Sequence, residues 1–187
     1  MREVLLARSA GFCYGVRRAV ELAEKTAADT GGCWMLGDLI HNAYVVEDLA
    51  RRGVRKTADP SSLGPGDTVV IRSHGERKGV LEDLEAREVR CINATCPNVV
   101  RIQRLVAQAE EEGRRTVIIG DPGHPEVTGV ASWCRDPLVF DGPEAVRRWL
   151  DSAPENRELP LTVAAQTTCI RELFETSWKI IKKECTN

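Results

Sequence analysis

Residues 118–129 have the sequence Ile-Ile-Gly-Asp-Pro-Gly-His-Pro-Glu-Val-Thr-Gly. The apolar, β-branched run over residues 116–119 predicts a short buried strand, and the glycines and prolines that follow require a turn. Pro125 and Glu126 are residue types that favour the first turn of a helix. A strand end, a turn, an imidazole and a carboxylate together could bind an anion and move a proton. A plain surface turn is the competing interpretation.

The composition sets broad limits on the class of protein. A chain of 187 residues has room for one ordinary domain or two small ones. Its formal charge of −2, with both signs interspersed, gives no reason to expect nucleic acid or an anionic membrane as a partner. No apolar run approaches the roughly 18 residues of a membrane span. The apolar run near the N-terminus is too short for a signal peptide, so we expect a cytoplasmic protein.

Strand-like and helix-like segments alternate along the whole chain. The predicted strands cover residues 3–7, 33–36, 68–72, 89–92, 116–119, 138–141 and 161–165. The predicted helices cover residues 15–28, 43–52, 78–87, 97–112, 126–132, 143–150 and 170–183. This alternation is typical of repeated α/β units with mainly parallel sheets. The pattern divides near residue 96, which predicts one α/β domain over residues 1–96 and a second over residues 97–187.

The histidines all follow predicted strands. The chain has three, and His41, His74 and His124 each come directly after a strand. Because the carboxyl ends of parallel strands share one edge of a sheet, where ligands bind, we expect the three imidazoles at that edge. Imidazoles beside helix starts suit a phosphate or diphosphate. Glu126, two residues from His124, is the natural acid for delivering a proton.

The seven cysteines are many for a chain that we expect to be intracellular, where disulfides are rare. We interpret Cys33, Cys91 and Cys134 as small apolar core residues. Cys13 and Cys96 instead lie in glycine- or proline-marked turns before predicted helices, and such a pair suits a shared metal or iron–sulfur site. Closely spaced cysteine pairs, typical of zinc sites, are absent. A cysteine–histidine nucleophile pair is the rival catalytic interpretation.

Six motifs together carry a resemblance to a known family. They are Ala10-Gly11-Phe12-Cys13-Tyr14-Gly15-Val16, Ile40-His41-Asn42, Ser73-His74-Gly75, Ala94-Thr95-Cys96-Pro97, Gly123-His124-Pro125-Glu126-Val127 and Gln166-Thr167-Thr168. In this order and spacing they resemble the LytB/IspH family, the 4-hydroxy-3-methylbut-2-enyl diphosphate reductases. The resemblance extends over nearly all of the chain.

The resemblance implies an oxidoreductase of isoprenoid biosynthesis, in the methylerythritol phosphate pathway. Such enzymes remove an allylic hydroxyl with two electrons and protons, giving isopentenyl and dimethylallyl diphosphate. It also implies a 4Fe-4S cluster, a ferredoxin or flavodoxin as electron donor, and three α/β domains arranged like a trefoil. Carried over by position, the cluster ligands are Cys13 and Cys96, the substrate-binding residues are His41, His74, His124 and Thr167, and the proton relay is Glu126.

The family pattern is only partly present. The third cluster cysteine and the serine- and asparagine-rich loops of the third domain lie further beyond the Gln166-Thr167-Thr168 motif than this chain extends. We therefore expect two of the three domains, and neither Cys169 nor Cys185 stands in the context of the third ligand.

The surroundings of Cys96 also depart from the family. Asn93, Arg101 and Gln103 stand where the family usually has aspartate, lysine and histidine, so the residues around this ligand are diverged. Two alternatives to the reductase stay open. One is a non-catalytic metal- or phosphate-binding module on the same scaffold. The other is a cysteine–histidine hydrolase or transferase that uses Cys96 or Cys13.

Overall fold

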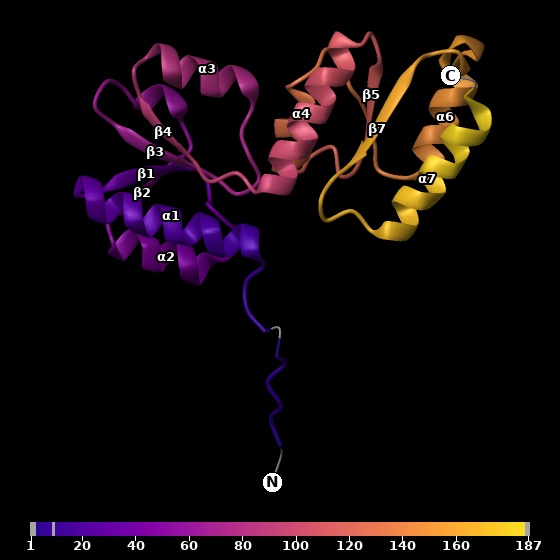
Figure 1. Ribbon diagram of the computed structural model, residues 1–187. Helices are drawn as coiled ribbons and strands as arrows, with labels where there is room; N and C mark the ends of the chain where they lie inside the picture. The colour runs from indigo at the N-terminus through magenta and orange to yellow at the C-terminus, as the bar shows by residue number, and fades with distance from the viewer. Residues whose placement is uncertain (1–2, 9, 186–187) are drawn as a thin grey trace.

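The computed structural model describes residues 3–8 and 10–185. Two separate parallel sheets, one of four strands and one of three, form two lobes that lie side by side (Figure 1). This confirms the predicted α/β class with parallel sheets. Within the described ranges, every helix is too short or too polar to cross a membrane.

The first lobe contains the four-stranded sheet, with the strand order β2-β1-β3-β4 and all neighbours parallel. Its strands are β1 (Cys33–Leu36), β2 (Val54–Thr57), β3 (Thr68–Ile71) and β4 (Arg90–Asn93). Its helices are α1 (Tyr14–Thr30), α2 (Ala43–Arg51) and α3 (Lys78–Ala86), with a short 3-10 turn at Pro60–Ser62. Helices α1 and α2 cover one face of the sheet and α3 covers the other (Figure 1).

Alternating side chains of the central strands form two apolar layers. Met35 and Val70 pack with Ala19 and other residues of α1, whose small alanines let the helix approach the sheet closely. Val69 of β3 packs on the opposite face, with Leu84 of α3. All four residues of β3 are buried, as expected for a strand covered by helices on both faces.

The second lobe contains the three-stranded parallel sheet, in the order β6-β5-β7. Its strands are β5 (Arg115–Ile119), β6 (Leu138–Phe140) and β7 (Leu161–Ala165). Its helices are α4 (Pro97–Glu111), α5 (Pro125–Ala131), α6 (Pro143–Ser152) and α7 (Arg171–Glu184), with a 3-10 turn at Pro154–Arg157. Residues of α4 and α5 pack on one face of β5, and residues of α6 and α7 pack on the other. Helix α4 stands between the two sheets (Figure 1).

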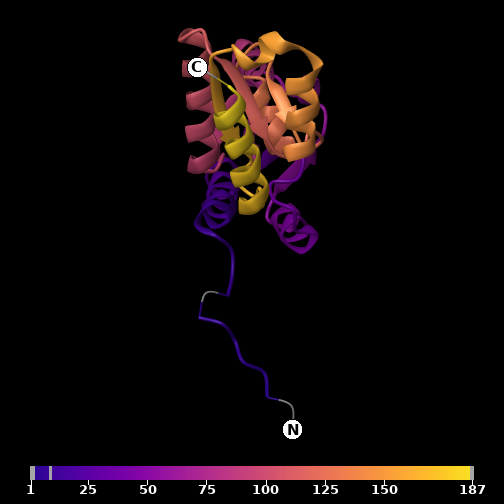
Figure 2. The same cartoon turned by 90° about the vertical axis from the view of Figure 1, so that its right-hand side faces the viewer.

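One predicted strand is wrong, and one strand of the structure was not predicted. Residues 3–7 do not form a strand; residues 3–8 form an arm that extends away from both lobes (Figures 1 and 2). Val4, Leu5 and Leu6 are 91%, 83% and 86% exposed, because no described strand lies beside them. Strand β2 was not predicted, since only Val54 of its four residues is buried and two others are exposed charges at the sheet edge.

The predicted burial of the three spare cysteines is confirmed only in part. Cys33 is buried in the first core, and Cys134 is partly buried against the core of the second lobe. Cys91 is exposed, so its assignment to the core is wrong. Its strand β4 lies at the edge of the sheet, where a side chain can face solvent.

Candidate functional site

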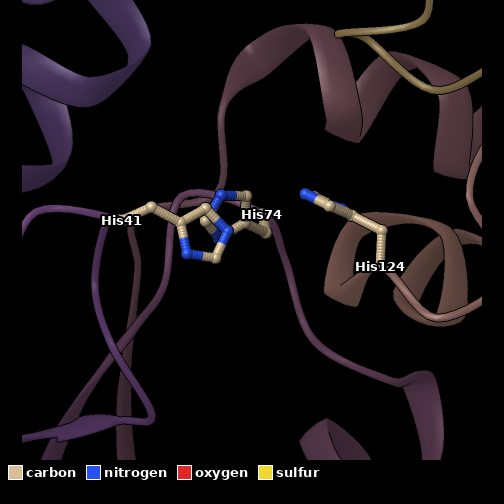
Figure 3. A group of neighbouring side chains, drawn as sticks. All are labelled: His41, His74 and His124. Atoms are coloured by element: carbon tan, nitrogen blue, oxygen red, sulfur yellow. The ribbon is translucent and has the colours of Figure 1, made fainter.

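Three histidines meet where the two lobes face each other. His41 follows β1, His74 follows β3, and His124 follows β5. The ring centroids lie 4.4 Å apart for His41 and His74, 5.7 Å for His41 and His124, and 5.4 Å for His74 and His124. Figure 3 shows His124 pointing from the second lobe toward the other two rings. One edge of each sheet thus contributes to a single imidazole cluster.

The turn after β5 fixes the orientation of His124. Its Nδ1 accepts a hydrogen bond of 3.1 Å from the backbone N–H of Glu126. The side chain of Asp121 accepts a bond of 2.8 Å from the N–H of Gly123, and its carbonyl accepts one of 3.0 Å from the N–H of His124. Because Nδ1 is an acceptor, the neutral ring carries its proton on Nε2 and offers that N–H to a ligand.

The turn that carries His74 is held by a partly buried ion pair. Arg72 pairs with Glu76 at 2.9 Å and also donates from Nε to the carbonyl of Gly75 at 3.1 Å. Glu76, which is 7% exposed, accepts a further bond from the N–H of Arg77. The sequence analysis missed this pair. A charged residue on each side of the Ser73-His74-Gly75 motif, four positions apart, was the signal that could have revealed it.

His74 is held in its neutral form. Burial, followed by the nearby charges of His41, His124 and Arg72, lowers its pKa from 6.5 to about 4. Its Nδ1 is buried without a hydrogen-bond partner among the described residues. A buried polar atom without a partner is uncommon in a folded protein and is available to a ligand.

This shift predicts a pH dependence of stability. Between pH 6.5 and about 4 the unfolded chain protonates His74 while the folded chain does not. The unfolded state therefore binds more protons, and the free energy of unfolding should fall as the pH falls, by up to about 3 kcal/mol. Urea unfolding of the wild type and of His74→Gln across this range measures the difference. Equal losses in both proteins would show that His74 is not the group responsible.

Glu126 is a buried carboxylate in the first turn of α5. It is 3% exposed, and in the described part of the chain no cation pairs with it. Instead Thr167 supplies both donors: its N–H lies 2.5 Å from one carboxylate oxygen and its hydroxyl lies 2.7 Å from the other. Because Thr167 itself is exposed, its hydroxyl connects the buried carboxylate with the open edge of the sheet.

Cys13 and Cys96 stand at the N-cap positions of two helices whose first turns lie close together. Each is the residue before its helix, α1 or α4, and neither side chain forms a capping hydrogen bond. The Tyr14 side chain lies near both thiols: partial desolvation raises its pKa above 10.0, and so do the charges of Cys96 and Cys13. A Cβ added to Gly15 would lie 2.7 Å from the sulfur of Cys96, so the first turn of α1 lies close to this thiol.

The described residues fit an iron–sulfur cluster only in part. Cys13 and Cys96 supply two free thiols on the same side of the molecule. Cys169 and Cys185 pack against the core beneath α6 and α7 instead. In residues 3–8 and 10–185 no third cysteine joins the pair, and the three histidines form the one cluster with metal-ligand spacing.

Comparison with known proteins identifies relatives. A family model described as "LytB protein" matches residues 4–187. The chain is 37% identical to 4-hydroxy-3-methylbut-2-enyl diphosphate reductase of Caldanaerobacter subterraneus subsp. tengcongensis, over 97% of this chain and 63% of the relative. It is 39% identical to the enzyme of that name from Geobacter sulfurreducens, over 98% of this chain and 61% of the relative. The chain thus spans less than two thirds of the length of these relatives.

Solved structures agree with the sequence comparison. A structure of (E)-4-hydroxy-3-methyl-but-2-enyl diphosphate reductase, the terminal enzyme of the non-mevalonate pathway, superposes with a TM-score of 0.82 at 33% identity, covering 99% of this chain and 65% of that one. The reductase from Plasmodium falciparum, at 23% identity and a TM-score of 0.86, supports the fold alone. On these matches, the chain belongs to the LytB protein family.

Proposed function

We propose that this chain is a 4-hydroxy-3-methylbut-2-enyl diphosphate reductase, forming isopentenyl and dimethylallyl diphosphate in the cytoplasm. We place its first domain over residues 1–96 and its second over residues 97–187, each with one sheet. The observation that carries the proposal is the meeting of three imidazoles from both lobes close to a buried carboxylate. The names of the relatives supply the substrate class.

The histidines are suited to bind the diphosphate. His124 offers its Nε2–H, and the buried Nδ1 of His74 has no partner of its own among the described residues. A diphosphate oxygen beside His74 favours its protonated form and gives a charge-assisted hydrogen bond. His41, the exposed member, completes the contact from the turn after β1. These three side chains orient the substrate by its diphosphate end.

Glu126 is suited to hold the proton that the reaction consumes. Removing the allylic hydroxyl as water takes two electrons and two protons, and a carboxyl group placed beside the substrate can deliver one of these protons as a general acid. The Thr167 hydroxyl both orients this carboxyl group and lines the path by which a proton reaches the open edge. The buried position keeps bulk water from competing for the proton.

Cys13 and Cys96 would hold two of the three thiolate positions of a 4Fe-4S cluster. A bound cluster supplies the electrons and a Lewis-acidic iron for the substrate hydroxyl. Both thiols are free, and each cysteine is the residue immediately before a helix. The third thiolate does not come from the described residues, so we derive no step through the cluster. The electrons would come from a ferredoxin or flavodoxin.

Titration with pyrophosphate and anaerobic iron loading test this function. Wild-type protein should bind pyrophosphate, and His41→Asn and His124→Asn should each weaken that binding about tenfold or more, the cost of one charge-assisted hydrogen bond. Lys25→Gln, which removes an exposed cation from α1, is the control and should change the affinity less than about twofold. Iron-loaded protein should be brown and should lose iron in Cys96→Ser. If both histidine variants bind pyrophosphate with the wild-type affinity, the assignment of these histidines to diphosphate binding is wrong.

A metal-binding module is the second candidate. One ligand atom from each of the three histidines lies within 4.8 Å of the others, which suits a divalent transition metal. Tight binding of one Zn²⁺, lost in His74→Gln, together with no affinity for pyrophosphate or iron, would favour this function over the reductase. The described residues show no hydrogen bond between a thiol and a histidine ring, so the structure lends a cysteine–histidine hydrolase no support.

A further inference from the structure

A cavity lined by three arginines lies beside the cysteines. It has a volume of about 400 Å³ and is lined by Arg18, Asn93, Thr95, Pro97, Val100, Arg101 and Arg104. We call it the arginine pocket. Arg18 comes from α1, and Arg101 and Arg104 come from successive turns of α4, so the pocket lies on the seam between the lobes.

The arginine pocket has positive charge without compensation. No carboxylate lines it, and Arg101 and Arg104 form no ion pair with any described residue. Arg18 donates instead to the carbonyls of Thr95 and Asn93, both at 3.2 Å, which holds its guanidinium in place. Arg101 and Arg104 are thus exposed beside the partly buried Arg18, on a chain whose net charge is −2.

The other large cavity provides a contrast. It lies between α6 and α7, and Asp151 and Glu184 stand among its basic residues. Both carboxylates pair with Arg157, at 2.9 and 3.6 Å. These two carboxylates offset half of the positive charge of the four basic residues in that cavity, Arg147, Arg157, Lys179 and Lys183. Helices α6 and α7 lie on the outer side of the second lobe (Figure 1).

The arginine pocket is next to the thiol pair. Thr95, which lines it and accepts from Arg18, immediately precedes Cys96. Three residues before Arg18, a Cβ added to Gly15 would lie 2.7 Å from the sulfur of Cys96, so the start of α1 is close to this thiol. A molecule bound in the pocket would therefore lie close to both proposed cluster ligands, Cys13 before α1 and Cys96 before α4.

We propose that the arginine pocket docks the carboxylate-rich surface of the electron-donor protein. The inference rests on the proposed function, because only a reductase requires electrons from an external protein. Guanidinium groups bind carboxylates in a bidentate manner, and an unbalanced positive patch steers an acidic partner to one orientation. Docking here brings the redox centre of the donor close to Cys96. The two arginines of α4 set the affinity, and Arg18 fixes the position of the pocket relative to Cys96.

The test measures binding of an oxidised acidic [2Fe–2S] ferredoxin to the purified chain by calorimetry, at low salt and at about 0.2 M salt. The double variant Arg101→Glu/Arg104→Glu should weaken ferredoxin binding at low salt by about tenfold or more. The control Lys179→Glu/Lys183→Glu makes the same change in net charge in the α6–α7 cavity and should change affinity less than about twofold. Circular dichroism confirms that both variants fold, and Arg101→Gln/Arg104→Gln should give an intermediate loss.

The outcomes separate this inference from the proposed function. If the two double variants weaken ferredoxin binding equally, or if neither weakens it, the docking site is wrong. This holds even when pyrophosphate binding still depends on the histidines. Loss of pyrophosphate binding in the Arg101→Glu/Arg104→Glu variant also overturns it, because the pocket would then serve a small anion. Failure of the wild type to bind pyrophosphate or iron overturns the proposed function, while ferredoxin binding at the arginine pocket can still be measured.

Discussion

Under the proposed function, replacing Glu126 with glutamine is expected to lower turnover of 4-hydroxy-3-methylbut-2-enyl diphosphate by about 100- to 10,000-fold, the range for loss of a general acid. Glutamine has nearly the same shape but carries no transferable proton. It also turns an amide NH₂ toward one of the two Thr167 donors, so the free energy of unfolding should fall by about 1–3 kcal/mol. Iron content and pyrophosphate affinity should stay unchanged, because neither Cys13, Cys96 nor the histidines change.

The matched control is Glu172→Gln, which removes an exposed carboxylate from the first turn of α7. Its turnover and stability should equal those of the wild type. Anaerobic assays of both variants, normalised to bound iron, measure the difference. If Glu126→Gln turns over at the wild-type rate, Glu126 is not the proton donor; if only its stability changes, the carboxylate has a structural role.

Replacing Gly15 with alanine is expected to lower iron affinity about 10- to 100-fold, as for a residue that positions a metal ligand. The new methyl group would lie 2.7 Å from the Cys96 sulfur and 3.2 Å from its Cβ, so the ligand or α1 must move. Iron bound per chain after anaerobic loading, at a series of iron concentrations, gives the affinity. The clash should also destabilise the fold by about 1–3 kcal/mol.

Gly79→Ala is the control for this substitution. Gly79 is the second residue of α3, as Gly15 is the second residue of α1, and a Cβ added there meets no atom within 4 Å. Alanine at Gly79 should therefore stabilise the chain by about 0.5–1 kcal/mol through helix propensity and leave iron binding unchanged. Stabilisation by both substitutions would show that Cys96 accommodates the methyl group without cost.

The periodicity of the sequence predicted the fold where side chains are buried. Strands β1, β3 and β5 form the sheet centres, and each has a continuous apolar sequence that local reasoning recognises. The edge strands β4, β6 and β7 were also predicted. The pattern fails in two places: β2 has exposed charges and was missed, while Val4–Leu6 has a strand-like composition but no neighbour to pair with. Strand pairing depends on a partner that the local sequence does not contain.

Part of the site could be predicted from one rule, that the carboxyl ends of parallel strands meet at the same edge of a sheet. That rule brings His41 and His74 to one edge, but it does not predict that an edge of a second sheet would present His124 to them. The Arg72–Glu76 pair and the arginine pocket depend on how a turn closes and how α1 meets α4. Such contacts between distant segments have no signature in the spacing of residues along the chain.

The division of the histidines between the lobes has a mechanical consequence. Two imidazoles belong to the first sheet and one to the second, so any rotation of one lobe against the other changes the distances within the cluster. A ligand that contacts all three rings must select one angle between the lobes, and by reciprocity the lobes at that angle bind it best. The affinity of this cluster for its ligand is therefore also a measure of how stiffly the two halves of the molecule are joined.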